Sequence, residues 1–227
     1  MRLLGGIITI ATLLFFTLPG CADSFRLPFA GTWFVAQGGD TLNVNHHMRV
    51  RSQAYGLDLA KVGGATGRSL SKATGKDTKD YFSWGEAVTA PTDGTIVAIE
   101  NDLPDNVIGV HDTEHPLGNY VVLKTKDGLF VFLAHMQHNS VRVLAGESVR
   151  SRDTLGQCGN SGNSDFPHIH MHVQNTADIA SGQGRNITFS SINVELSGKK
   201  FEHVDWPLIR GLFVSNSTGL PRKQFSD

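Results

Sequence analysis

The sequence has very few cysteines, and this scarcity excludes two kinds of structure. Its 227 residues include only Cys21 and Cys158. A framework of disulfides needs several paired cysteines, and a zinc site built on thiolates needs several cysteines at short spacing. Any metal site in this protein must therefore use histidine and carboxylate side chains.

The sequence also lacks a concentrated run of charge of either sign. The formal net charge is −1, and 18 % of the residues are charged. Proteins that bind nucleic acid usually carry a basic patch, which is missing here. Because 40 % of the residues are hydrophobic, we expect a globular protein with one sizeable core. The lack of a basic run predicts no nucleic-acid partner. We also expect a monomer.

Long hydrophobic runs are rare, and the prominent one lies at the start of the chain. Arg2 precedes an apolar stretch at residues 3–18, which small residues follow. This pattern is typical of an export signal, and the stretch is too short and interrupted for a comfortable membrane span. We expect a signal peptide at residues 1–20 and a location in the periplasm or cell envelope.

Two ways of processing this signal stay open. Residues 18–21 read LPGC and resemble the bacterial lipobox, which would make Cys21 a lipid anchor, although Pro19 departs from the usual residue. Ordinary cleavage after Ala22 is the alternative. Either way, Cys158 would be left as a single cysteine.

Residues with helical periodicity are scarce, whereas short apolar runs alternate with turn residues. The runs at 119–124 and 129–135 flank Asp127 and Gly128, which is a strong hairpin pattern. Further strands are expected at residues 42–47, 54–60, 95–99, 187–189 and 192–196. Hairpins are also expected within residues 84–99, through the turn at 92–94, and within residues 141–149.

These patterns predict an all-β fold with a mostly antiparallel sheet. We expect an open groove walled by long loops at residues 61–79 and 101–118. A short N-terminal segment at residues 21–36 would lead into a single domain at 37–215. A C-terminal tail would occupy residues 216–227.

Residues 167–173 read PHIHMHV, which sets three imidazoles at alternate positions in an apolar run. In a strand, His168, His170 and His172 would share one face, and the apolar residues between them would face the core. Neutral imidazole is the commonest metal ligand and also titrates near physiological pH. This strand is therefore a candidate for metal binding and proton transfer.

Two other places offer metal ligands: the pair His46 and His47, and Asp58. Asp58 lies among apolar neighbours and needs a partner, because an unpaired buried charge costs several kcal/mol. A catalytic zinc typically takes three ligands from histidine and carboxylate, and two histidines with one aspartate would meet that need. His135 ends an apolar strand and remains available for proton transfer.

Together these motifs resemble the lysostaphin-like (LytM-type) zinc metallopeptidases, which cut peptidoglycan cross-links. The likeness includes FLAHM at residues 132–136, WGEAVTAPTDG at 84–94 and GNSGNS at 159–164, and it spans about residues 38–175. It implies one zinc ion and peptidoglycan peptides as substrate. The ligands it implies are His47, Asp58 and His170, and the catalytic pair it implies is His135 with His168.

One departure from the family pattern concerns the first ligand. The commonest pattern places a histidine four residues before the aspartate, where this chain has Ala54. The sequence resembles instead a branch with an earlier Asn-x-His, matched by residues 45–47. We favour His47 over His46 as the ligand.

The sequence leaves several roles open. Either His135 or His168 could be the general base, and His172 is expected to support the site. We expect the four remaining histidines to be ordinary surface residues: His111, His115, His138 and His203. A catalytically inactive regulator of other murein hydrolases is the alternative function, although such relatives usually lack ligands that this chain keeps.

Overall fold

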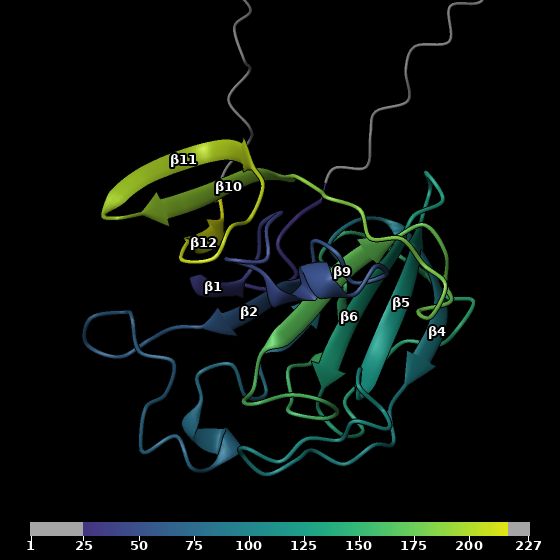
Figure 1. The fold of residues 1–227 in the computed structure, drawn as a ribbon, viewed down its shortest axis with the longest axis horizontal. Coiled ribbons are helices and arrows are strands. Elements are labelled where there is room, and N and C mark those ends of the chain that lie inside the picture. Colours follow the sequence, from purple (N-terminus) through teal and green to yellow (C-terminus); the bar gives the residue numbers. More distant parts are fainter. Residues whose placement is uncertain (1–24, 218–227) are drawn as a thin grey trace, which may run out of the picture.

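The hairpin expected around Asp127 and Gly128 is present in the computed structural model, which describes residues 25–217. Strand β5 (Asn119–Thr125) pairs antiparallel with β6 (Phe130–Met136). Gly128 takes a φ of 81° in the connecting turn, a conformation that glycine adopts without strain. On its other edge, β6 pairs with β9 (Ile169–Gln174), so the two strands with the predicted site histidines are neighbours (Figure 1).

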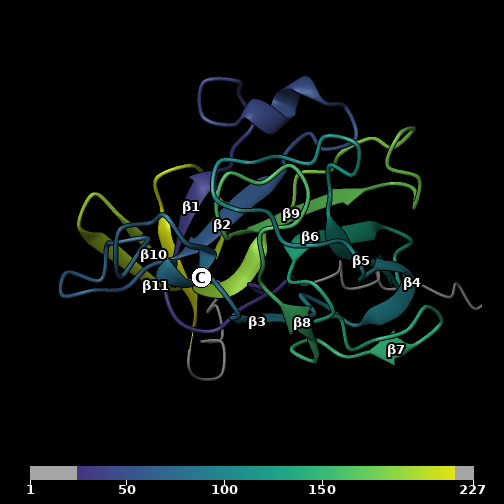
Figure 2. The ribbon, with the colours of Figure 1, turned by 90° about the horizontal axis from the view of Figure 1, so that it is seen from below.

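One ten-stranded sheet contains these strands, in the order β11-β10-β12-β1-β2-β9-β6-β5-β4-β7. Its other strands are β1 (Trp33–Gln37), β2 (Leu57–Lys61), β4 (Gly94–Glu100), β7 (Ser148–Val149), β10 (Phe189–Leu196), β11 (Lys199–Trp206) and β12 (Phe213–Asn216). Strands β3 (Ala87–Thr89) and β8 (Thr154–Gln157) form a separate pair (Figure 2). The pairings between strands are antiparallel, which confirms the predicted fold class.

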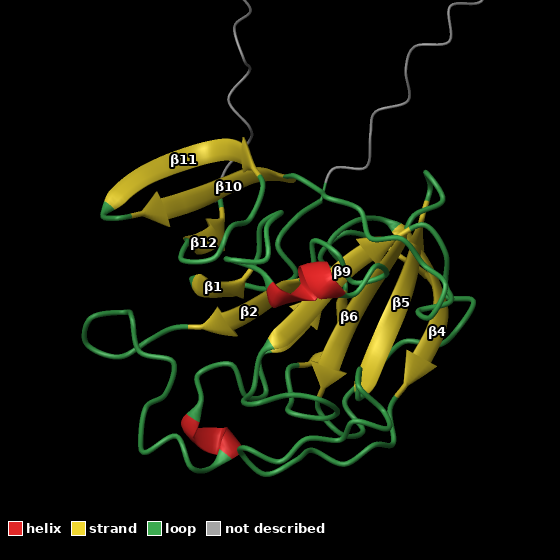
Figure 3. Cartoon of the chain, viewed as in Figure 1, coloured by secondary structure: helices red, strands yellow, loops and turns green. Residues whose placement is uncertain are grey.

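Helical structure in the described residues is limited to two short 3-10 turns. They are η1 (His46–Arg49) and η2 (Thr78–Asp80), drawn in red in Figure 3. Within residues 25–217, no helix has the length and apolar character needed to cross a membrane.

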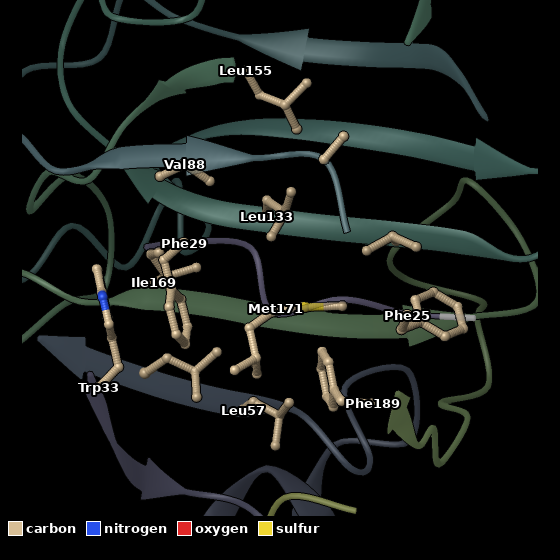
Figure 4. Close-up of a cluster of buried hydrophobic side chains, with 14 of the residues drawn as sticks. Phe25, Phe29, Trp33, Leu57, Val88, Leu133, Leu155, Ile169, Met171 and Phe189 are labelled. Carbon is tan, nitrogen blue, oxygen red and sulfur yellow. The ribbon is translucent and has the colours of Figure 1, made fainter. Parts of the chain in front are cut away.

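The apolar face of β9 packs into the main core, as the alternation of residues 167–173 predicted. Ile169 and Met171 lie in one buried cluster with Leu57 of β2 and Leu133 of β6 (Figure 4). Val88 and Leu155 bring β3 and β8 into the same cluster (Figure 4). A smaller buried cluster that includes Phe132 and Val122 lies apart from it.

Two of the expected hairpins are wrong. Strand β3 pairs with β8, whereas β4 pairs with β5 and β7, so residues 84–99 do not fold on themselves. Gly94 is a strand residue in close contact with β5, because a Cβ there would lie 2.4 Å from the Lys124 carbonyl oxygen. In residues 141–149 only β7 is a strand, and it pairs with β4.

The expected strand at residues 42–47 is also wrong. These residues form turns and the start of η1. The side chain of Asn45 accepts a hydrogen bond from the backbone N–H of His47 at 3.1 Å. This bond caps a helical turn and so competes with an extended conformation.

The N-terminal part of the described chain belongs to the same core. Phe25, Leu27, Phe29 and Trp33 are all members of the main buried cluster. Cys158 is a free, buried cysteine. The predicted signal peptide at 1–20, Cys21 and residues 218–227 of the predicted tail lie outside the described residues, and the predicted domain boundaries stay predictions.

Candidate functional site

One carboxylate oxygen, Oδ1 of Asp58, is the point where the candidate residues meet. His47 Nε2 lies 2.9 Å from it and His170 Nδ1 lies 3.0 Å from it. His168 Nε2 is 3.5 Å from the same oxygen. Asp58 of β2 is paired in register with His170 of β9, so the sheet itself brings together residues that are 112 positions apart.

Hydrogen bonds of the Asn45 side chain hold the turn that positions His47 beside this carboxylate. Besides capping η1, the Asn45 amide donates hydrogen bonds to the carbonyl oxygens of Gly39 and Gly56, at 2.8 and 3.0 Å. Gly56 also makes room for the imidazoles, because a Cβ there would lie 3.1 Å from the His47 ring and 3.2 Å from the His170 ring. The turn before β2 thus holds His47 over the start of that strand, where η1 lies beside β2 and β9 (Figure 3).

His46 competes with His170 for the third ligand position. In the part of the chain that the structure describes, one group of three has all its ligand atoms within 4.8 Å of one another, and it consists of His46, His47 and Asp58. His170 contacts the same carboxylate directly and is buried, whereas His46 is exposed. Only proximity supports His46, whereas contact with Asp58 and burial support His170, so we favour His170 as the third ligand.

The two predicted catalytic histidines are oriented by backbone carbonyl groups. Nδ1 of His135 lies 2.9 Å from the carbonyl oxygen of Ser161, and Nδ1 of His168 lies 2.7 Å from that of Phe166. A carbonyl oxygen only accepts, so each Nδ1 carries the proton and each Nε2 is left for other partners. The two ring centroids are 4.8 Å apart.

His135 has an unusual backbone conformation for a residue with a Cβ. Its φ is +61°, although it lies within β6. Non-glycine residues in this region are strained, and such strain is concentrated at functional sites. The irregular pairing of β5 with β6 near Val121 accompanies this turn of the backbone.

Burial and mutual charge shift the pKa values of these groups in different directions. Burial lowers the pKa of His135 well below its usual value, and it lowers that of His170 to about 3. For His168, burial is the largest single influence and lowers the pKa, but the charge and hydrogen bond of Asp58, the Phe166 carbonyl group and the charge of Asp165 together outweigh it, so the net shift is upward. Burial alone would raise the pKa of Asp58, yet its contacts, with that to His168 the strongest, hold it well below the usual range.

The site opens into a pocket of about 440 Å³. It is lined by His46, His47, Val50, Gln53, Asp58, His111, Pro116, Leu117, His135, Asn163, Asp165, His168 and His170. The expected loop at 101–118 contributes part of this lining, whereas the loop at 61–79 contributes none. All five predicted site residues, and His46 as the alternative first ligand, therefore line one pocket.

One histidine of this pocket was not predicted as a site residue. His111, expected to be an ordinary surface residue, lies at the pocket with Nδ1 2.9 Å from Asn163 Oδ1 and Nε2 3.2 Å from Asp165 Oδ1. It sits in a loop without periodicity, so its sequence context carries no indication of this position. Its partners lie just before the histidine strand, at residues 163 and 165.

The donor set fits a zinc ion. Neutral imidazole and carboxylate are both zinc ligands, and two ligand atoms on a tetrahedral zinc lie roughly 3.3 Å apart given bonds of about 2.0–2.1 Å. The contacts of 2.9 and 3.0 Å from Asp58 to His47 and His170 are close to that spacing. These two spacings suit a metal bound by Asp58 with His47 and His170, whereas the three ligand atoms that, among the described residues, all lie within 4.8 Å of one another are those of His46, His47 and Asp58.

Comparisons with known proteins give the family. A model described as peptidase family M23 matches residues 74–186. This range contains His135, His168 and His170, whereas His47 and Asp58 lie before it.

Solved structures that match part of this chain include three peptidases. Pseudoalterin, an M23 metalloprotease from the deep sea, has 16 % identity and a TM-score of 0.46, over 84 % of this chain and 100 % of that one. Lysostaphin from Staphylococcus simulans has 20 % identity and a TM-score of 0.41, over 71 % and 51 %. A zinc-containing peptidase from Vibrio cholerae has 14 % identity and a TM-score of 0.39, over 66 % of this chain and only 36 % of that longer one.

The first prediction concerns the cap on η1. Asn45→Ala removes three hydrogen bonds of a side chain that is 1 % exposed, so we expect the free energy of unfolding to fall by about 1–3 kcal/mol. Asn43→Ala makes the same change at an exposed position two residues earlier, where about 0.5 kcal/mol or less is expected. Urea unfolding of the two variants beside the wild type measures both, and equal stabilities would contradict the role of Asn45.

The second prediction concerns pH. In metal-free protein, His135, His170 and His172 all have lowered pKa values, about 3 for the last two, whereas unfolded imidazoles titrate near 6.5. As pH falls below about 6.5, the unfolded chain binds protons that the folded protein does not, so stability falls by up to about 1.4 kcal/mol per pH unit for each group. The pKa of His168 is raised, so its stabilising contribution is complete below about pH 6.5 and is lost only as pH rises above that value.

Urea unfolding in the presence of a chelator, repeated from neutral pH to pH of about 4, measures this slope. His172→Phe should reduce the slope by the contribution of one imidazole, up to about 1.4 kcal/mol per pH unit. Leu144→Ala, at a position that is 70 % exposed, should leave the slope unchanged. A stability that is constant or rises as pH falls would show that these histidines accept protons in the folded state.

Proposed function

The chain belongs to peptidase family M23, as its motifs predicted, and from this premise we propose that it is a zinc-dependent endopeptidase that hydrolyses amide bonds in peptidoglycan peptide cross-links. The observation that carries the proposal is the convergence of three histidines on one oxygen of Asp58. Burying a carboxylate among imidazoles is unfavourable for stability. Such clusters, in a pocket open to solvent, are typical of functional sites.

We assign His47, Asp58 and His170 as the ligands of one zinc ion. His170 is preferred to His168 because its nitrogen is closer to Asp58, at 3.0 against 3.5 Å. It is preferred to His46 because it is buried. A zinc ion in this position would polarise the scissile carbonyl group and lower the pKa of water at the site.

The remaining two histidines handle protons and developing charge. Each of His135 and His168 has its Nδ1–H committed to a backbone carbonyl, so Nε2 is the atom that can accept a proton or donate one to the substrate. General acid–base groups at such positions contribute about 10²–10⁴ in rate. Donation toward a tetrahedral oxyanion would add electrostatic stabilisation.

The pocket would hold the peptide against these groups. His111 and Leu117, on the loop at 101–118, form one wall, and residues around η1 form another. An extended peptide between these walls would place one amide bond over Asp58. We further propose that the protein is exported to the periplasm or cell envelope, on the basis of the signal predicted at residues 1–20.

The third prediction tests ligands and activity together. Purified His47→Ala, Asp58→Ala and His170→Ala should each lose zinc and activity, because each lacks a ligand. His46→Ala should keep its zinc and serves as the matched control. His135→Ala and His168→Ala should keep zinc but lose at least about 100-fold in rate. Metal content is measured by atomic spectroscopy, and cleavage by mass spectrometry of cross-linked muropeptides.

Two outcomes would contradict this account. Loss of zinc in His46→Ala but not in His47→Ala would move the first ligand to His46. A zinc-loaded wild type that releases no new amines from cross-linked muropeptides would favour the inactive regulator instead. Removal of zinc with a chelator should abolish cleavage, and added zinc should restore it.

A further inference from the structure

Strand β9 carries a line of polar side chains on the face that holds the site. His170, His172 and Gln174 alternate along it and are 2 %, 1 % and 0 % exposed. Buried polar side chains are expensive unless they are hydrogen-bonded. These three buried side chains extend in a line away from the candidate metal position. Hydrogen bonds that link them would satisfy their polar groups.

The two ring nitrogens of His170 have different partners. Nδ1 lies 3.0 Å from Asp58 Oδ1, on the side of the candidate metal, and Nε2 lies 2.9 Å from Nδ1 of His172. A neutral imidazole that gives the lone pair of Nδ1 to a metal must carry its proton on Nε2. That proton points at His172, whose Nδ1 must then be an acceptor without a proton of its own.

This requirement fixes the state of His172 in turn. With Nδ1 as an acceptor, its proton sits on Nε2, which is buried and has no hydrogen-bond partner among residues 25–217. In the same described part of the chain, Oε1 of Gln174 is also buried without a partner. One atom is a donor and the other an acceptor, and they belong to residues that are neighbours on one face of β9.

The orientation of the Gln174 amide is settled by its other contacts. Its Nε2 donates hydrogen bonds to the carbonyl oxygens of Thr176 and Asp178, at 2.8 and 3.0 Å. Both amide hydrogens are thus used, and Oε1 is left as the acceptor. Burial lowers the pKa of His172 to about 3, while the Gln174 side chain acts in the opposite sense.

We propose that His172 and Gln174 form a hydrogen-bond relay that holds the His170 imidazole in the tautomer with Nδ1 free for a metal. The direction is His170 Nε2–H to His172 Nδ1, then His172 Nε2–H to Gln174 Oε1. His172 and Gln174 are positioning residues, since neither reaches Asp58. The relay rests on the proposed function, because it takes His170 as a metal ligand.

Neighbouring residues keep the members of the relay in place. The ring of His172 stacks on Phe132 of β6, its partner in register, with centroids 4.5 Å apart and planes at 9°. Gly182 lies against the Gln174 amide, where a Cβ would come within 2.6 Å of its atoms. The His172 ring and the Gln174 amide therefore have little freedom to turn, so the donor and acceptor atoms of the relay keep their positions.

The fourth prediction measures zinc affinity by competition with a chelator. His172→Phe keeps the aromatic ring on Phe132 but removes the acceptor for His170 Nε2–H, so we expect zinc to bind about 10- to 100-fold more weakly. His172→Asn places an amide oxygen near the position of Nδ1 and should recover most of the affinity. His138→Phe makes the same change at an exposed histidine near Asp102 and should leave the affinity unchanged.

A second measurement does not depend on any variant. Long-range ¹H–¹⁵N NMR spectra of zinc-loaded protein, at a pH above the titration of free imidazole, report which ring nitrogen carries each proton. The relay predicts protons on Nε2 of both His170 and His172. A proton on Nδ1 of His172 would reverse the donor and acceptor and overturn the proposal.

The outcomes separate this proposal from the one on which it rests. If His170→Ala binds zinc as tightly as the wild type, the ligand assignment fails and the relay fails with it. If His170→Ala loses zinc but His172→Phe binds it as tightly as the wild type, the relay alone is wrong. Equal loss in His172→Phe and His172→Asn would also contradict it, because packing would then explain the effect.

Discussion

The buried carboxylate of Asp58 is the group on which the rest of this site depends. A carboxylate that is only 8 % exposed is stable as an anion only if donors or a metal surround it. His47, His168 and His170 provide that surrounding from two distant parts of the chain. The pairing of β2 with β9 therefore contributes to the sheet and also brings Asp58 to the histidines.

The order of strands explains how one sheet serves two purposes. Strand β9 lies between β2 and β6, so its neighbours bring Asp58 from one side and His135 from the other. The apolar residues of β9 pack in the main core, and its histidines line the other face. Both faces of the strand are buried, which fixes its register, because a slip by one residue would exchange core and site.

Local patterns in the sequence predicted much of this arrangement. Alternation identified β9 and its two faces, and turn residues identified the β5–β6 hairpin that ends at His135. The turn that holds His47 was wrongly predicted as a strand, because its polar and apolar residues alternate. The hydrogen bonds of Asn45 to Gly39 and Gly56, which stabilise the turn in place of a strand, cannot be inferred from that alternation. His111 acquires its position from contacts with Asn163 and Asp165, which no spacing in the sequence reveals.

The central claim is that one zinc ion is bound by His47, Asp58 and His170. Anomalous X-ray diffraction at the zinc edge, from crystals of zinc-loaded protein, tests it most directly. The account predicts a single strong anomalous peak within about 2.0–2.2 Å of His47 Nε2, Asp58 Oδ1 and His170 Nδ1. A peak bonded to His46, or one bonded to His168 in place of His170, would contradict it.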